Sequence, residues 1–458
     1  MTQNTQWLIR VWIMLIFAFL PWAFGTVEPW SIYGVLVAIA LGVIGTVLLS
    51  GRHALKHMTG LFVYLGILWA LFGWTLMNPM ELDVFALHAQ GKIIHRESIE
   101  WLPASLVPWR SLDKLLLWSG CGAFAWLVSH HFRDRKALRV LIIFLLANAT
   151  FLILVAILQK VTDAQKILWF RPITFFWDPN LPMPFVGPFV NRNHFAAYIN
   201  LIWPLAFPLY VILLKRHRKN EVKRKDSIIL LFILLGIMVS GIFLSASRGG
   251  ALTASLMVLI SLCLFPRILL RLPWYYWVAA LIGIGLLLGF FGEGLLERVL
   301  KSFGQDHHRI GHDGRWLIWK DCPQIIAASP VFGWGPGCFR TIFAFFKDPV
   351  ILYRIEYAHN DYIETLVESG VMGAVFWALV LIVVSIIVVR GILRLQSRFR
   401  SALAKAAVLS LVGMLIHAGL DFPFQMGGLS LTFAGLLGIS LGAIHSSSIK
   451  IDESEEAT

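Results

Sequence analysis

The stretch GVMGAVFWALVLIVVSIIVV, residues 370–389, decides the fold class, because it carries no charged residue over the length of a bilayer crossing. A transmembrane helix needs about 20 mostly apolar residues. Working outward from this stretch, we find eleven others of the same character, so the sequence predicts twelve transmembrane helices. They are residues 8–24, 31–49, 58–77, 112–129, 139–158, 193–214, 227–246, 250–266, 273–291, 370–389, 402–420 and 428–446.

The composition agrees with a membrane protein. Hydrophobic types make up 58% of the chain and charged types only 14%, whereas a soluble domain has about 25% charged residues. The net charge of +13 comes from Lys and Arg in the short segments between spans on one side of the predicted membrane. This bias is the positive-inside pattern of an inner-membrane protein whose two termini are cytoplasmic. The charge therefore indicates orientation and contact with anionic lipid, and it argues against a nucleic-acid partner.

Three long segments are then expected to face the periplasm, namely 78–111, 159–192 and 292–369. The longest of them separates the ninth span from the tenth, and its residues 313–328 have the pattern of an amphipathic helix lying on the membrane surface. Long ordered loops often carry function. The predicted fold class is thus an all-α integral membrane protein with about twelve spans and a large periplasmic loop.

Common catalytic motifs are mostly absent: the sequence contains no P-loop, no H-E-x-x-H and no Asp-x-Asp pair. The first candidate is Arg248, within Ser-Arg-Gly-Gly at 247–250, where the seventh span leaves the membrane. An arginine at that depth needs an anionic partner or water. The alternative is an interfacial arginine that reaches lipid headgroups.

Two further candidates lie in the largest periplasmic segment. Arg315 follows Asp313, which is a suitable N-cap for the amphipathic helix, so Arg315 falls in its first turn. His359 can accept a proton near neutral pH, and its neighbours Asn360 and Asp361 are candidates to orient the ring. The alternatives are a solvated arginine on the polar helix face and a surface histidine that caps a helix.

Weaker candidates stand at the ends of other spans. Asn193 and His194 open the sixth span, and His417 and Asp421 lie one helical turn apart at the end of the eleventh. Ionisable groups inside spans are usually functional, although His417 and Asp421 would also be explained by pairing with each other. The cluster 306–313, which contains three histidines and two aspartates, lacks a firm metal-ligand spacing.

The four cysteines lie in two kinds of predicted location. Cys121 and Cys263 lie inside spans and are expected to be small apolar fillers. Cys322 and Cys338 both lie in the large periplasmic segment, where an oxidising compartment permits a disulfide. Two unpaired thiols remain the alternative.

These motifs, taken in order, resemble those of the O-antigen ligase and O-antigen polymerase superfamily of bacterial membrane glycosyltransferases. The resemblance rests on Ser-Arg-Gly-Gly at 247–250, Gly-Arg-Trp at 314–316 with Trp319, Gly-Trp-Gly-Pro-Gly at 333–337, His359-Asn360, and Glu-Ser-Gly at 368–370. It is strong over about 190–440. It implies a GT-C-like fold with N-terminal helices over 1–190, a catalytic region over 191–446 that includes loop 292–369, and an acidic cytoplasmic tail over 447–458.

The resemblance also implies an activity, which is transfer of a glycan from a polyprenyl (undecaprenyl) diphosphate carrier to an acceptor hydroxyl at the periplasmic face. No cofactor and no metal are expected, and direct displacement would invert the anomeric centre. Arg248 and Arg315 would hold the diphosphate, and His359 would be the base. The further substrate-binding candidates are Asn360, Asn193, His194, Glu368, His417 and Asp421.

The expected partners are the lipid-linked glycan donor, membrane lipids, and lipid A core or a growing polysaccharide as acceptor. Ligase and polymerase share the motifs, so the second activity stays open as an O-antigen or exopolysaccharide polymerase. A polysaccharide transporter or flippase is an alternative of another class, because multiple spans with intramembrane ionisable residues suit one. A non-catalytic scaffold is a third.

Overall fold

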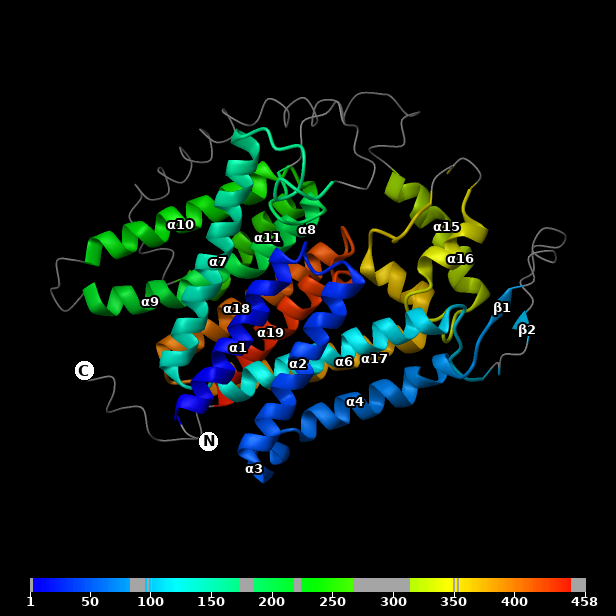
Figure 1. Ribbon diagram of the computed structural model, residues 1–458, viewed down its shortest axis with the longest axis horizontal. Coiled ribbons are helices and arrows are strands. Elements are labelled where there is room, and N and C mark those ends of the chain that lie inside the picture. The colour runs from blue at the N-terminus through cyan, green and yellow to red at the C-terminus, as the bar shows by residue number, and fades with distance from the viewer. Residues whose placement is uncertain are drawn as a thin grey trace.

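The computed structural model describes residues 3–82, 95–96, 99, 101–172, 185–217, 224–266, 314–348, 351 and 354–445. Over these residues the chain is a bundle of helices (Figure 1), with one short antiparallel pair formed by β1 (Glu81–Leu82) and β2 (His95–Arg96). Eight helices of the described part are long and apolar enough to cross a membrane. They are α1 (Gln3–Trp22), α2 (Pro29–Ser50), α4 with the turn after it (Thr59–Leu76), α7 (Arg135–Val161), α8 with the start of α9 (Arg192–Leu213), α17 (Asp361–Arg394), α18 (Arg398–Ala418) and α19 (Gly427–His445).

Three other predicted spans correspond to helices that are less apolar or have a shorter apolar stretch. They are α6 (Pro108–His131), α10 (Arg224–Leu244) and α11 (Arg248–Leu264). The predicted ninth span, 273–291, lies outside the described residues. The prediction of an all-helical multi-pass membrane protein is thus confirmed, while the number twelve stays a prediction.

The predicted span 193–214 is a broken helix. The chain forms α8 (Arg192–Ile202), a 3₁₀ turn over Trp203–Leu205 and α9 (Ala206–His217). Pro204 stands in that turn and has no backbone N–H to donate, which explains the interruption.

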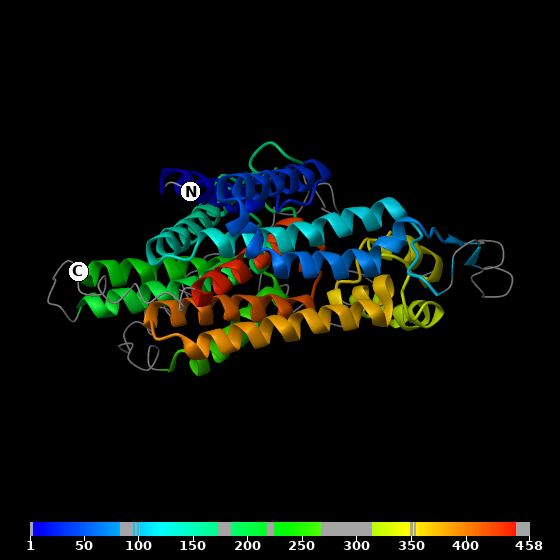
Figure 2. The same ribbon diagram turned by 90° about the horizontal axis from the view of Figure 1, so that it is seen from below.

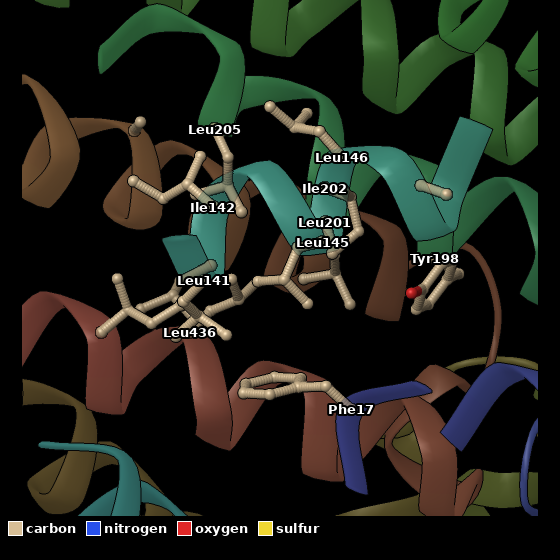
Figure 3. Close-up of a cluster of buried hydrophobic side chains, with 14 of the residues drawn as sticks. Phe17, Leu141, Ile142, Leu145, Leu146, Tyr198, Leu201, Ile202, Leu205 and Leu436 are labelled. Atoms are coloured by element: carbon tan, nitrogen blue, oxygen red, sulfur yellow. The ribbon is translucent and has the colours of Figure 1, made fainter. Parts of the chain in front are cut away.

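The bundle core is built around α7, α8 and α19. Figure 3 shows Leu145 of α7 near Leu201 of α8, with Phe17 of α1 and Leu436 of α19 completing the cluster, all of them buried. Helix α19 also packs very closely on α6, since a Cβ added at Gly438 would lie 2.6 Å from the carbonyl oxygen of Ala125. Small residues permit this approach between helices in lipid, where van der Waals contact is a main source of association.

A second, smaller hydrophobic cluster caps one end of the bundle, where Figures 1 and 2 both show α15 and α16 beside the start of α17. It joins α15 (Gly314–Ala328), α16 (Phe339–Phe346) and the beginning of α17 through buried side chains that include Ile325, Trp334, Phe339 and Val367. The predicted helix over 313–328 is confirmed by α15. This cap includes the helix that carries Arg315.

Candidate active site

His359 stands directly before α17 and is held in an unusual backbone conformation. Its φ is +53°, in the left-handed region that few non-glycine residues adopt. The next residue, Asn360, is the N-cap of α17, and its side-chain oxygen accepts from the N–H groups of Tyr362 and Ile363 at 3.0 and 3.1 Å. The helix start therefore fixes where the His359 side chain begins.

The imidazole of His359 is paired with Asp421, which follows the C-terminal end of α18. The Nδ1 atom lies 3.0 Å from Oδ1 of Asp421. The His359 side chain is 33% exposed, whereas that of Asp421 is 1% exposed. Because Nδ1 bonds the carboxylate, Nε2 is the nitrogen left to face a substrate. The pair is a buried acid orienting a partly accessible base.

Arg315 reaches the same carboxylate from the first turn of α15. One guanidinium nitrogen lies 4.0 Å from Oδ1 of Asp421, and another donates a hydrogen bond to the carbonyl oxygen of Leu420. The Arg315 side chain is 40% exposed. The guanidinium is thus anchored on one side and open on the other, as a group that receives an anion must be.

Two buried histidines surround this centre. His194, in the first turn of α8, and His417, in the last turn of α18, are both buried, and within the described part of the chain neither ring nitrogen of either has a hydrogen-bond partner. His194 lies within electrostatic reach of His359, His417 and Asp421, and His417 within reach of Asp421 and Arg315. Oδ2 of Asp421 has no hydrogen-bond partner among the described residues either. Buried polar atoms are normally hydrogen-bonded, so these nitrogen and oxygen atoms are available to bind water or a polar ligand.

The ring of Phe422 joins these groups. It stacks on Tyr357 at a centroid distance of 4.3 Å, and the rings of His359 and His194 meet it edge-on at 4.7 and 5.0 Å. Phe422 was not a predicted site residue. Its position directly after Asp421 was the only signal in the sequence.

The environment of Asp421 favours its ionised form. Burial by itself would raise the pKa of this carboxyl group, but the hydrogen bond with His359 and the positive charge of Arg315 hold the pKa below its ordinary value. The carboxylate is therefore present at any pH near neutrality.

The partners of Asp361 and Asn360 differ from those expected. Asp361 does not orient His359: its carboxylate accepts from the N–H of Phe424 at 2.9 Å and from the side chain of Gln425 at 3.1 Å. Asn360 donates to the carbonyl oxygen of Gly419 at 3.1 Å. Nor does His417 pair with Asp421 through a ring nitrogen, since Asp421 bonds His359 instead. The residue that orients the ring is 62 positions away along the chain, beyond the reach of local sequence patterns.

Glu368 and the glycine-rich stretch 333–337 form one backbone junction. Oε1 of Glu368 accepts from the N–H of Phe339 at 3.0 Å, and its carbonyl oxygen accepts from Gly335 at 2.8 Å. Gly370 interrupts α17 with φ +59°, and a Cβ added there would lie 2.4 Å from the carbonyl oxygen of Val331. A Cβ at Gly333 would lie 2.5 Å from the backbone of Glu368. These motifs thus dock the cap onto α17.

The remaining predicted residues lie at the edges of the site. Arg248 is the first residue of α11 and its side chain is exposed. A Cβ added at the next residue, Gly249, would lie 3.4 Å from Leu420 and 3.9 Å from a ring nitrogen of His417. Asn193 lies in the first turn of α8, where its N–H donates to Asn191. The start of α11 therefore lies against the end of α18.

The cysteines and the possible metal site can be placed in part. All four cysteines are unpaired, and Cys322 and Cys338 are buried thiols. Among the described residues no group of three or more His, Cys, Asp or Glu is arranged to hold a metal ion. The histidine and aspartate cluster at 306–313 lies outside them.

Comparison with known protein families gives a match to the O-antigen ligase model over residues 230–378. Comparison with curated proteins gives no match. The matched segment includes α11, α15, α16 and the start of α17, and thereby Arg248, Arg315 and His359. The match supports a membrane glycosyltransferase of the ligase or polymerase kind. The match supports the resemblance to the O-antigen ligase superfamily over residues 230–378.

Proposed function

We propose that this protein transfers a glycan from a polyprenyl diphosphate, undecaprenyl diphosphate in particular, to an acceptor hydroxyl at the periplasmic face of the inner membrane. The observation that carries the proposal is the convergence of Arg315 and His359 on the carboxylate of Asp421. An anion-binding cation and a base are thereby held side by side in a partly accessible site, which is what glycosyl transfer from a diphosphate requires.

Arg315 and Arg248 hold the diphosphate of the donor. Arginine stays protonated, and its planar fork matches phosphate oxygens. Negative charge grows on the diphosphate as it leaves, and a fixed cation stabilises that growth more than it stabilises the bound donor. Arg315 suits this role because its anchors on Leu420 and Asp421 leave the guanidinium partly exposed.

His359 accepts the proton of the acceptor hydroxyl at Nε2. The acceptor oxygen forms a bond to the anomeric carbon as the bond from that carbon to the diphosphate oxygen breaks, and the carrier departs as polyprenyl diphosphate. Attack opposite to the leaving group inverts the anomeric centre. Asp421 bonds Nδ1 at 3.0 Å, so it stabilises the imidazolium that forms. Energy comes from the carrier bond, and the step needs no nucleotide.

His194 and His417 line the reacting site and supply further hydrogen bonds to substrate, since their ring nitrogens are buried and unpartnered within the described residues. Asn360 and Glu368 act through backbone contacts that shape the site. Asn193 lies at its margin, where α8 begins.

A deletion of the gene in its host tests the function. Loss of long chains from lipid A core, with lipid-linked polymer accumulating, means a ligase. Loss of a secreted polysaccharide, or products with a single repeat, means a polymerase. Complementation with Arg315→Ala should fail in either case, although the protein should reach the membrane in normal amount. A glycan profile unchanged by the deletion contradicts the proposal. The transporter and scaffold alternatives would then have to be tested.

A further inference from the structure

The backbone of Ala358 connects the start of α17 to α15. Its N–H donates to Oε2 of Glu364 at 2.8 Å, and its carbonyl oxygen accepts from Nε1 of Trp319 at 2.8 Å. Ala358 and Glu364 are buried at 0% and 1% exposure. Glu364 belongs to the first turns of α17, and Trp319 belongs to α15.

These hydrogen bonds involve residues close to the proposed catalytic groups. Ala358 immediately precedes His359. Trp319 stands one helical turn after Arg315 on α15, so both project from the same side of that helix. The bond between Trp319 and Ala358 therefore connects the backbone that carries His359 to the helix that carries Arg315.

The backbone of His359 requires such support. A φ of +53° for a non-glycine residue persists where the surrounding structure over-determines it. On the C-terminal side, Asn360 caps α17 and bonds Gly419. On the N-terminal side, Glu364 accepts from the backbone N–H of Ala358, and Trp319 donates to its carbonyl oxygen. The conformation that aims the imidazole at Asp421 is thus fixed from both directions.

We infer that Glu364 and Trp319 are positioning residues, which act through the Ala358 peptide to hold His359 in its left-handed conformation and at a set separation from Arg315. The inference rests on the proposed function, because it assigns the base role to His359. It goes beyond that proposal by naming two residues that touch neither substrate nor the reacting atoms and still control turnover.

The test uses the full-length protein purified in detergent, with lipid-linked donor extracted from a deletion strain. Glu364→Leu removes the acceptor for the Ala358 N–H, whereas Glu364→Gln keeps an oxygen at that position. Trp319→Phe removes the indole N–H donor and keeps an aromatic ring. We expect Glu364→Leu and Trp319→Phe to lower kcat, by up to the roughly 10²-fold that a misplacement of about 1 Å costs. Glu364→Gln should restore most of the turnover.

Donor binding is measured separately, with undecaprenyl diphosphate as the probe. The inference predicts a nearly unchanged dissociation constant in all three variants, because the anchors of Arg315 on Leu420 and Asp421 remain. Equal losses for Glu364→Gln and Glu364→Leu, or a loss of probe binding parallel to the loss of kcat, would overturn it. Trp319→Phe gives an independent answer if Glu364→Leu fails to fold.

His359→Ala separates this inference from the proposed function. If His359→Ala keeps wild-type transfer, the proposed base assignment fails. If His359→Ala is inactive and both Glu364→Leu and Trp319→Phe keep wild-type kcat, the base assignment stands and the positioning inference fails.

Discussion

The imidazole of His359 and the carboxylate of Asp421 form a hydrogen-bonded pair at 3.0 Å, although 62 positions separate them along the chain. The pair joins the loop before α17 to the loop after α18. Among the described acidic side chains, the buried Asp421 is the one that contacts His359. The orientation of the His359 ring therefore depends on α17 and α18 remaining packed together.

Asp421→Asn should lower kcat strongly, because the amide can present its N–H₂ to Nδ1 and select the tautomer that no longer accepts a proton at Nε2. We expect a loss of at least about 10²-fold, the lower end of what general base catalysis contributes. Turnover assays with extracted donor measure it. Asp361→Asn is the matched control, since Asp361 bonds Phe424 and Gln425 and not the ring. Equal losses in the two variants would contradict the assigned partner of His359.

The ionisation of Asp421 should also appear in the pH dependence of stability. Its pKa is lower in the folded protein than in an unfolded chain, so its ionisation stabilises the fold above the unfolded value of about 4 and this contribution is lost as the pH falls below it. Thermal unfolding midpoints of wild type and Asp421→Asn should therefore differ from pH 7 to about pH 4 and approach each other at lower pH. A difference that shrinks between pH 7 and pH 5 would contradict the lowered pKa.

Arg315→Lys should not replace the arginine. A single ammonium group cannot hold Leu420 and Asp421 with separate nitrogens, as the guanidinium does, and still face a diphosphate. We expect a loss of transfer of about 10²-fold, the scale of removing one donor from a developing charge. Binding of undecaprenyl diphosphate, followed by quenching of tryptophan fluorescence, should weaken as well. Full activity in the lysine variant would show that charge alone is required.

Gly333→Ala should destabilise the cap. The left-handed backbone at Gly333 costs alanine about 1–2 kcal/mol, and the added Cβ would lie 2.5 Å from the backbone of Glu368. The thermal midpoint in detergent should fall. Gly236→Ala in α10 is the control, because a Cβ there meets nothing within 4 Å, and its midpoint should stay equal or rise. No difference between the two variants would mean that the junction with α17 contributes little.

Cys322 and Cys338 should behave as protected thiols. Burial raises the pKa of Cys322 to about 12 and that of Cys338 to about 11, so the reactive thiolate is scarce at neutral pH. In a variant with Cys121→Ala and Cys263→Ala, which removes the other two thiols, a maleimide gel shift should show little labelling of the folded protein. Both remaining residues should be labelled after denaturation, without need of a reductant. Labelling that requires a reductant would show a disulfide.

Local patterns predicted the helices well because burial in lipid leaves a long apolar signal in the chain. The start of α15 at Gly314 and the placement of Arg315 in its first turn also followed from local signals. The break at Pro204 was missed because a count of apolar residues ignores the missing N–H of proline. The helical extension of α17 back to Asp361 was missed because it runs through Asp361, Glu364 and Glu368, polar residues that tertiary contacts bury.

The sequence pointed to most residues of the candidate site, but it did not predict which of their side chains contact each other. His194, His417 and Asp421 were selected as ionisable groups at span ends, yet their sequence neighbourhoods do not reveal that Asp421 faces His359 and Arg315. Phe422 was overlooked because a phenylalanine in an apolar chain carries no distinguishing signal, although it contacts two of the histidines.

The close backbone contact between Gly333 and Gly370 has a consequence for relatives of this chain. The glycine-rich stretch 333–337 and Glu368-Ser369-Gly370 hold the cap against α17, while the proposed reacting groups are other residues. A homologue that kept these architectural motifs and lost Arg315, His359 and Asp421 should still fold and reach the membrane. We would expect it to be a pseudoenzyme that binds or organises envelope glycans without transferring them.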